Sequence, residues 1–172
     1  MDSPALVLLL RLVHLFAGIF WVGGMFVVML FVLPAQRSLA DEGRFMRELM
    51  VARKLSTWFG VAAGLTVLAG FALYHRNIVV SDGRWASTPM AMTLGVGAVA
   101  SLVAMIVGGA VSGRSQRRIA ALAQRLAAAG APPTPEQRQE LATLQRRAML
   151  GARLTLGLLV LATLTMAVAR YL

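Results

Sequence analysis

The chain has 172 residues, of which 58% are hydrophobic and only 14% are charged, too few polar residues to cover a water-soluble globule of this length. Its formal net charge is +10, but the basic residues fall between apolar runs instead of forming a stripe, which argues against nucleic-acid binding. The absence of cysteine excludes disulfides, thiolate nucleophiles and iron–sulfur clusters. We therefore expect lipid to surround much of this protein.

Four apolar runs predict an all-α fold, an integral membrane four-helix bundle in a single domain, because each has the roughly 20 residues that cross the hydrocarbon layer. The predicted spans lie at about 5–33, 55–75, 89–112 and 149–170. The first run is too long for a signal peptide and lacks a basic leader and a cleavage site. It is expected to be a retained membrane helix.

The charges of the connections predict the orientation. Thirteen of the 17 Lys and Arg residues lie in the first and third connections, and the other four lie on the opposite side. The positive-inside rule then places both basic connections in the cytoplasm and both termini outside, as in a multi-pass protein of a bacterial inner membrane. Tyr74, Trp85 and Tyr171 would lie at the outer interface, where amphipathic rings are favoured.

The third connection predicts a cytoplasmic helical hairpin over about 114–147. Apolar residues recur there at helical spacing: Ile119, Leu122 and Leu126, then Leu141 and Leu144. Gly130 is expected to end the first helix, and the sequence from Thr134 to Gln137 has the arrangement of a capping box that starts the second. A turn near position 131 would set Leu122 opposite Leu141 and Ile119 opposite Leu144. The alternative is a loosely ordered surface loop.

Glycines are dense in the third span, at Gly95, Gly97, Gly108 and Gly109. Small residues let helix backbones approach closely in lipid, so these positions predict helix packing. Besides the lipid bilayer, the expected partner is a second copy or a larger membrane complex that docks on this span and on the hairpin.

All seven acidic residues lie outside the four spans, which argues against a proton-coupled transporter or a carboxylate-bridged metal site. The sequence has no phosphate-binding glycine loop, paired-carboxylate motif or HExxH motif, so neither a hydrolase nor a nucleotide-driven pump is expected. Redox chemistry would need a bound cofactor, and any enzymatic activity would be that of a haem-dependent oxidoreductase.

Two histidines remain as candidate ligands. His14 lies 19 residues before Leu33, roughly 28 Å at helical rise, near the outer edge of the hydrocarbon. His75 is expected to end the second span at the same edge, so the two imidazoles could hold haem b by two axial nitrogens. Arg11, Arg76 and Arg84 lie close enough in sequence to pair with propionates. The alternative is an interfacial histidine and a solvated helix end.

One face of the first span carries His14, Gly18, Trp21 and Met25, at i, i+4, i+7 and i+11. This face is expected to line the bundle. Gly18 would leave room for a flat macrocycle, and Trp21 would form a wall of the pocket. Alternatively, Gly18 simply receives a neighbouring helix.

The segment RLVHLFAGIFWVGG, residues 11–24, resembles the first helix of several bacterial membrane protein families: the copper-resistance D (CopD) type, the membrane-anchored urate oxidase type and, more distantly, the HemJ type of protoporphyrinogen oxidase. The resemblance carries His14, Trp21, Gly23 and Gly24. It implies haem or porphyrin binding with His14 as a ligand. Where the HemJ type has a Pro-Arg pair and then a histidine, this chain has Met29, Leu30 and Ala35.

Met90, Met92 and Met166 lie near the predicted outer side, and thioethers with imidazole suit Cu(I). Three functions therefore follow from the sequence. The first is haem b binding near the outer face, in electron transfer or haem handling. The alternatives are a CopD-type copper-uptake permease and a cofactor-free accessory subunit of a larger complex.

Overall fold

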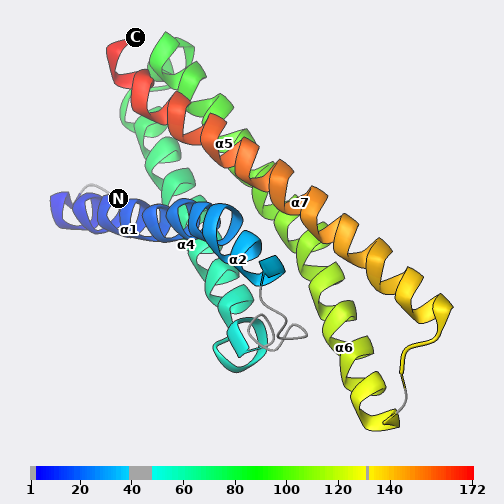
Figure 1. The fold of residues 1–172 in the computed structure, drawn as a ribbon. Helices are drawn as coiled ribbons and strands as arrows, with labels where there is room; N and C mark the ends of the chain where they lie inside the picture. Colours follow the sequence, from blue (N-terminus) through cyan, green and yellow to red (C-terminus); the bar gives the residue numbers. More distant parts are fainter. Residues whose placement is uncertain (1–2, 39–47, 131) are drawn as a thin grey trace.

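The computed structural model describes residues 3–38, 48–130 and 132–172, and in these ranges the regular structure is entirely helical. Four helices of the described chain are long and apolar enough to cross a membrane: Pro4–Ala35, Leu55–Val80, Pro89–Leu126 and Pro135–Tyr171. The prediction of an all-helical protein with four such helices is confirmed (Figure 1). Arg44 and Arg47 of the predicted first basic connection lie outside the described residues.

The first long helix consists of α1 (Pro4–Val27), a π-helical turn (Val28–Val32) and α2 (Leu33–Ser38). A second π-helical turn (Glu48–Ala52) precedes α4 (Leu55–Val80), and a 3-10 turn (Arg84–Ser87) leads into α5 (Pro89–Val107). A third π-helical turn (Gly108–Gly113) joins α5 to α6 (Arg114–Ala129). The last long helix, α7 (Pro135–Val168), ends in a 3-10 turn (Ala169–Tyr171).

The helices associate as two pairs, α1 with α4 and α5 with α7, and the pairs meet where α1 touches α7 and α4 touches α5. Trp21 is 4% exposed at this junction, in one cluster with Ala62, Ala63, Ala104 and Leu159. Most of the buried apolar residues are alanines. Small side chains let backbones approach closely, which favours helix association where lipid removes the hydrophobic drive between helices.

Large apolar side chains lie on the outer surface of the bundle. Phe16 and Leu68 are each 70% exposed, and Phe71 is 69% exposed. In water such a surface would drive aggregation, whereas hydrocarbon solvates it. The pattern of small residues inside and large ones outside is therefore that of a bundle in lipid.

Glycines of α5 and the following π-helical turn pack against α7. A Cβ atom at Gly97 would lie 2.6 Å from Thr165 Oγ1, and one at Gly108 would lie 3.4 Å from Thr155 Oγ1. At Gly109, by contrast, no heavy atom in the described part of the chain lies within 4 Å of an ideal Cβ. The packing role predicted for this span is thus confirmed at Gly97 and Gly108, and the helix that packs on these two glycines belongs to the same chain.

The connection between α6 and α7 has the predicted end signals. Gly130 has φ +62° and ends α6 in the left-handed region, which favours glycine. Thr134 Oγ1 accepts from the Gln137 backbone N–H at 3.3 Å, while Gln137 Oε1 accepts from the Thr134 N–H at 2.8 Å, which completes the capping box. Helices α6 and α7 pack on each other in antiparallel directions (Figure 1). The register of Leu122 with Leu141 and of Ile119 with Leu144 stays a prediction.

The end of helix α4 differs from the predicted end of the second span. The helix was expected to end at His75, but it continues to Val80, so His75 lies five residues inside the helix. The reversal comes later, where Asp82 (φ 50°) and Gly83 (φ 81°) adopt left-handed conformations and the Gly83 N–H donates to the Ile78 carbonyl at 2.9 Å. The stop signal was this Asp-Gly pair.

The α4–α5 connection is fixed by polar groups and rings. Tyr74 donates its hydroxyl hydrogen to the Ala91 carbonyl at 3.1 Å, and its ring meets Trp85 edge-on at a centroid distance of 5.0 Å. The Thr88 hydroxyl accepts from the Ala91 N–H at 3.2 Å and caps α5. Tyr74 and Trp85, both predicted for the same interface, thus lie side by side.

Candidate functional site

The site begins where α1 packs against α4. Close approaches run in opposite directions along the two helices: His14 at Gly70, Gly18 at Thr66, and Gly24 at Phe59. The predicted bundle-facing stripe of α1 is therefore confirmed, and His14 is half-buried within it.

His14 is held by one hydrogen bond across the interface. Its Nδ1 atom lies 2.8 Å from the main-chain carbonyl oxygen of Thr66. A carbonyl oxygen can only accept, so Nδ1 carries the hydrogen, and in the neutral ring Nε2 keeps its lone pair. The Thr66 hydroxyl donates to the Ala62 carbonyl at 2.7 Å and does not compete for this bond. The arrangement leaves Nε2 as the ring atom able to bind a metal.

Gly70 provides the seat for the imidazole. An added Cβ atom there would lie 2.7 Å from His14 Cε1 and 2.9 Å from Nδ1, closer than any ordinary contact. The ring therefore occupies the space of the missing side chain. Sequence reasoning missed Gly70 and Thr66, although Ala62, Thr66 and Gly70 recur every four residues in an apolar span, the spacing of a small-residue face.

Gly18 and Trp21 take packing positions. A Cβ atom at Gly18 would meet Thr66 Cγ2 at 3.6 Å, an ordinary contact, so this glycine receives α4. Trp21 is buried in the centre of the bundle, and Met25 packs against the same cluster. The arrangement favours the alternative interpretation of Gly18 as a helix contact, and it gives Trp21 a structural role.

His75 lies on the outer face of α4. It is exposed, and it continues a stripe formed by Leu68 (70% exposed), Phe71 (69%) and Val79 (58%). Five residues separate His75 from Gly70, which turns it about 140° around the helix from the seat of His14. The structure therefore does not bring the two imidazoles to one face, contrary to the expected bis-histidine arrangement.

The two arginines expected at the site differ in their surroundings. Arg11 is exposed, whereas Arg76 is partly buried on the α4 face that carries Ala62 and Ala69, which are 6% and 4% exposed. The Arg76 Nε atom is buried and has no hydrogen-bond partner among the described residues. A buried donor without a partner costs free energy that an anionic ligand would recover.

The methionines considered for copper face different ways. Met92 is 60% exposed, whereas Met166 packs beside Gly97, where an added Cβ would lie 3.3 Å from Met166 Cγ. Within the part of the chain that the structure describes, no three His, Cys, Asp or Glu residues gather as a metal-ligand group.

Comparison with known proteins found no matching family model, no matching curated protein and no matching solved structure.

Proposed function

We propose that this chain is an integral membrane protein that binds haem b through Nε2 of His14, and that it acts in electron transfer or haem handling. The observation that carries the proposal is the 2.8 Å hydrogen bond between His14 Nδ1 and the Thr66 carbonyl. Metal-binding histidines commonly donate their second ring N–H to a carbonyl, because this fixes the ring and makes the ligating nitrogen more basic. His14 has this support before any ligand binds.

A single imidazole suits haem better than it suits a bare metal ion. The porphyrin supplies four ligands to its iron, while a bare transition-metal ion usually needs three or four protein side chains. His14 has no such group of ligands beside it in the described chain. Haem b, when bound, supplies one-electron redox chemistry, and the protein holds and orients it.

Arg76 is our candidate for the contact with a propionate. Its Nε atom is buried with no partner among the described residues, and it lies six residues beyond Gly70, about 9 Å along the helix axis and about 120° around it. We leave His75 out of the site because it shares the outer stripe with Leu68 and Phe71. Arg11 is exposed and is assigned at most a weak role in binding.

The absorption spectrum of protein purified after expression with ample haem tests this proposal. Wild-type protein should show a Soret band, His14→Ala should lose it, and His75→Ala should keep it. A Soret band that survives His14→Ala, or none in the wild type, would contradict haem binding through His14. His75→Ala is the matched control, because it removes the same side chain from the outer face.

We also propose that both termini lie outside a bacterial inner membrane, with α6 and the first part of α7 forming a cytoplasmic hairpin. The 13-to-4 distribution of Lys and Arg supports this orientation. Reporter fusions after Pro133 should report the cytoplasm, and fusions after Asp82 should report the outer side. The reverse pattern would overturn the orientation.

A cofactor-free subunit of a larger membrane complex, or of a homo-oligomer, is the second candidate function. One observation favours it: among the described residues, no heavy atom lies within 4 Å of a Cβ added at Gly60 or Gly64 of α4. The two glycines are four residues apart, the spacing that lets a second helix approach closely in lipid. A subunit of this kind would lack a Soret band and would lose stability when purified alone.

A further inference from the structure

Five arginines form a group on the two helices that continue beyond the bundle. They are Arg114, Arg117 and Arg118 of α6 with Arg146 and Arg147 of α7, here named the arginine band. All five are exposed. Sixteen of the 17 basic residues in the chain are arginines, whose planar guanidinium groups can bind phosphate with two hydrogen bonds.

The arginine band lies at the depth of lipid headgroups. Ala104 and Leu159 belong to the buried cluster around Trp21, near the middle of the third and fourth apolar spans. At helical rise, the Cα atoms of the band lie about 15 to 21 Å along the helices from these two residues. A hydrocarbon layer about 30 Å thick ends about 15 Å from its middle, and the headgroups occupy the next several ångströms.

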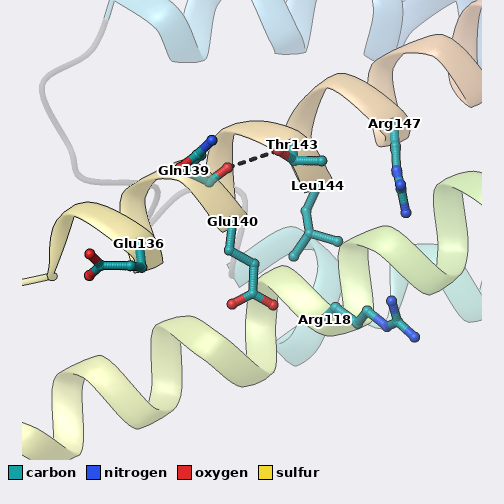
Figure 2. A pocket seen from close by; sticks show the side chains of 7 residues that line it. All are labelled: Arg118, Glu136, Gln139, Glu140, Thr143, Leu144 and Arg147. Carbon is teal, nitrogen blue, oxygen red and sulfur yellow. Dashed lines mark hydrogen bonds between the residues drawn. The ribbon is translucent and has the colours of Figure 1, made fainter.

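Packing between α6 and α7 holds the band in place. Ser115, Leu144 and Ala148 are 6%, 5% and 5% exposed, so these residues face the interior, whereas all five arginines are exposed. Figure 2 shows Leu144 directed toward α6, with Arg118 of α6 and Arg147 of α7 on the same side of it. Both arginines line one pocket of about 370 Å³ between the helices. The charged groups are therefore carried by two helices that pack on each other.

Carboxylates near the pocket lie farther from the membrane than the band. Glu136 and Glu140 line the same pocket, but they lie about 34 Å and 28 Å along α7 from Leu159. In the described chain, the ion pair seen is Arg53 with Glu48, at 3.2 Å, and it involves neither helix of the band. The positive charge of the band is thus available to an external anion.

We propose that the arginine band binds the phosphate groups of anionic lipids in the surrounding leaflet. The proposal rests on the depth, exposure and charge of these five residues, and it is independent of haem binding at His14. Arginines near a membrane surface each strengthen binding to anionic lipid, by about fivefold per residue. Zwitterionic lipids lack the net charge that this attraction requires.

Native mass spectrometry of the full-length protein in micelles tests the proposal, with dioleoyl phosphatidylglycerol and dioleoyl phosphatidylcholine as probes. The test variant is Arg118→Gln with Arg147→Gln, and the control is Arg125→Gln with Arg138→Gln. Each double variant removes one exposed arginine from α6 and one from α7. Along the helices, Arg125 lies about 31 Å from Ala104 and Arg138 lies about 31 Å from Leu159, so both control residues lie beyond the headgroups.

The wild type and the control should retain phosphatidylglycerol in preference to phosphatidylcholine, and the test variant should bind it at least about tenfold more weakly. An equal loss of phosphatidylglycerol binding in the two double variants would overturn the proposal, and so would equal binding of the two lipids by the wild type. Inorganic phosphate that displaces the lipid at millimolar concentration would assign the band to a free anion instead. If the test variant unfolds in micelles without added lipid, Arg114→Gln with Arg146→Gln replaces it.

Discussion

Replacing Gly70 with alanine is the sharpest test of how His14 is held. A Cβ atom at this position would lie 2.7 Å from His14 Cε1, and ordinary contacts begin at 3.4 Å. The imidazole would have to move away from α4, which lengthens the 2.8 Å bond between His14 Nδ1 and the Thr66 carbonyl. The variant thus removes the orientation of the ring without touching the histidine itself.

The size of the effect follows from two contributions. Loss of one hydrogen bond costs about 0.5–1.5 kcal/mol, and inserting a methyl group into a filled contact costs about 1–3 kcal/mol. Gly64→Ala is the matched control, because Gly64 lies on the same helix and no heavy atom of the residues that the structure describes is within 4 Å of an added Cβ. Both variants gain the same helix propensity, so it cancels. We expect Gly70→Ala to be less stable than Gly64→Ala by about 1.5–4.5 kcal/mol.

Thermal unfolding in detergent micelles, followed by circular dichroism, measures the difference, and the Soret absorbance of the same samples reports the ligand site. Gly70→Ala should unfold at a lower temperature and bind less haem than Gly64→Ala. Equal unfolding temperatures with equal Soret absorbance would refute the reasoning, because they would show that the imidazole does not need this seat.

Trp21→Ala should destabilise the protein by about 3–5 kcal/mol, because it empties the centre of the bundle. Trp58→Ala should cost far less, because Trp58 is 60% exposed, and chemical unfolding in micelles compares the two variants. Thr134→Ala should cost about 1 kcal/mol and fray the start of α7, seen as faster amide hydrogen exchange there. Tyr74→Phe should lose about 0.5–1.5 kcal/mol with its bond to the Ala91 carbonyl, detected as a lower unfolding temperature.

Much of the fold could be predicted because its signals are local. Apolar runs of spanning length indicate the four long helices, Gly130 ends α6, and the box of Thr134 and Gln137 starts α7. Each signal depends on residues that are neighbours in sequence. The end of α4 was misplaced because a histidine beside an arginine suggested a solvated boundary, while the stop is the later pair of Asp82 and Gly83.

The site was less predictable because it depends on rotation about a helix. Depth alone placed His14 and His75 near one level, but the face that each presents is set by packing between helices. Small residues at Thr66 and Gly70 decide where α1 rests on α4, and this turns His75 outward. The partner of His14 is a main-chain carbonyl, a group that every residue carries, so no pattern of side chains could have indicated it.

Haem titration of apoprotein in micelles, followed by Soret absorbance, tests the central proposal most directly. We expect the wild type and His75→Ala to saturate at one haem per chain, and His14→Ala to show no saturable binding. Binding at one haem per chain in all three proteins would contradict the role of His14. Loss of saturable haem binding in both variants would instead support a site that needs both histidines.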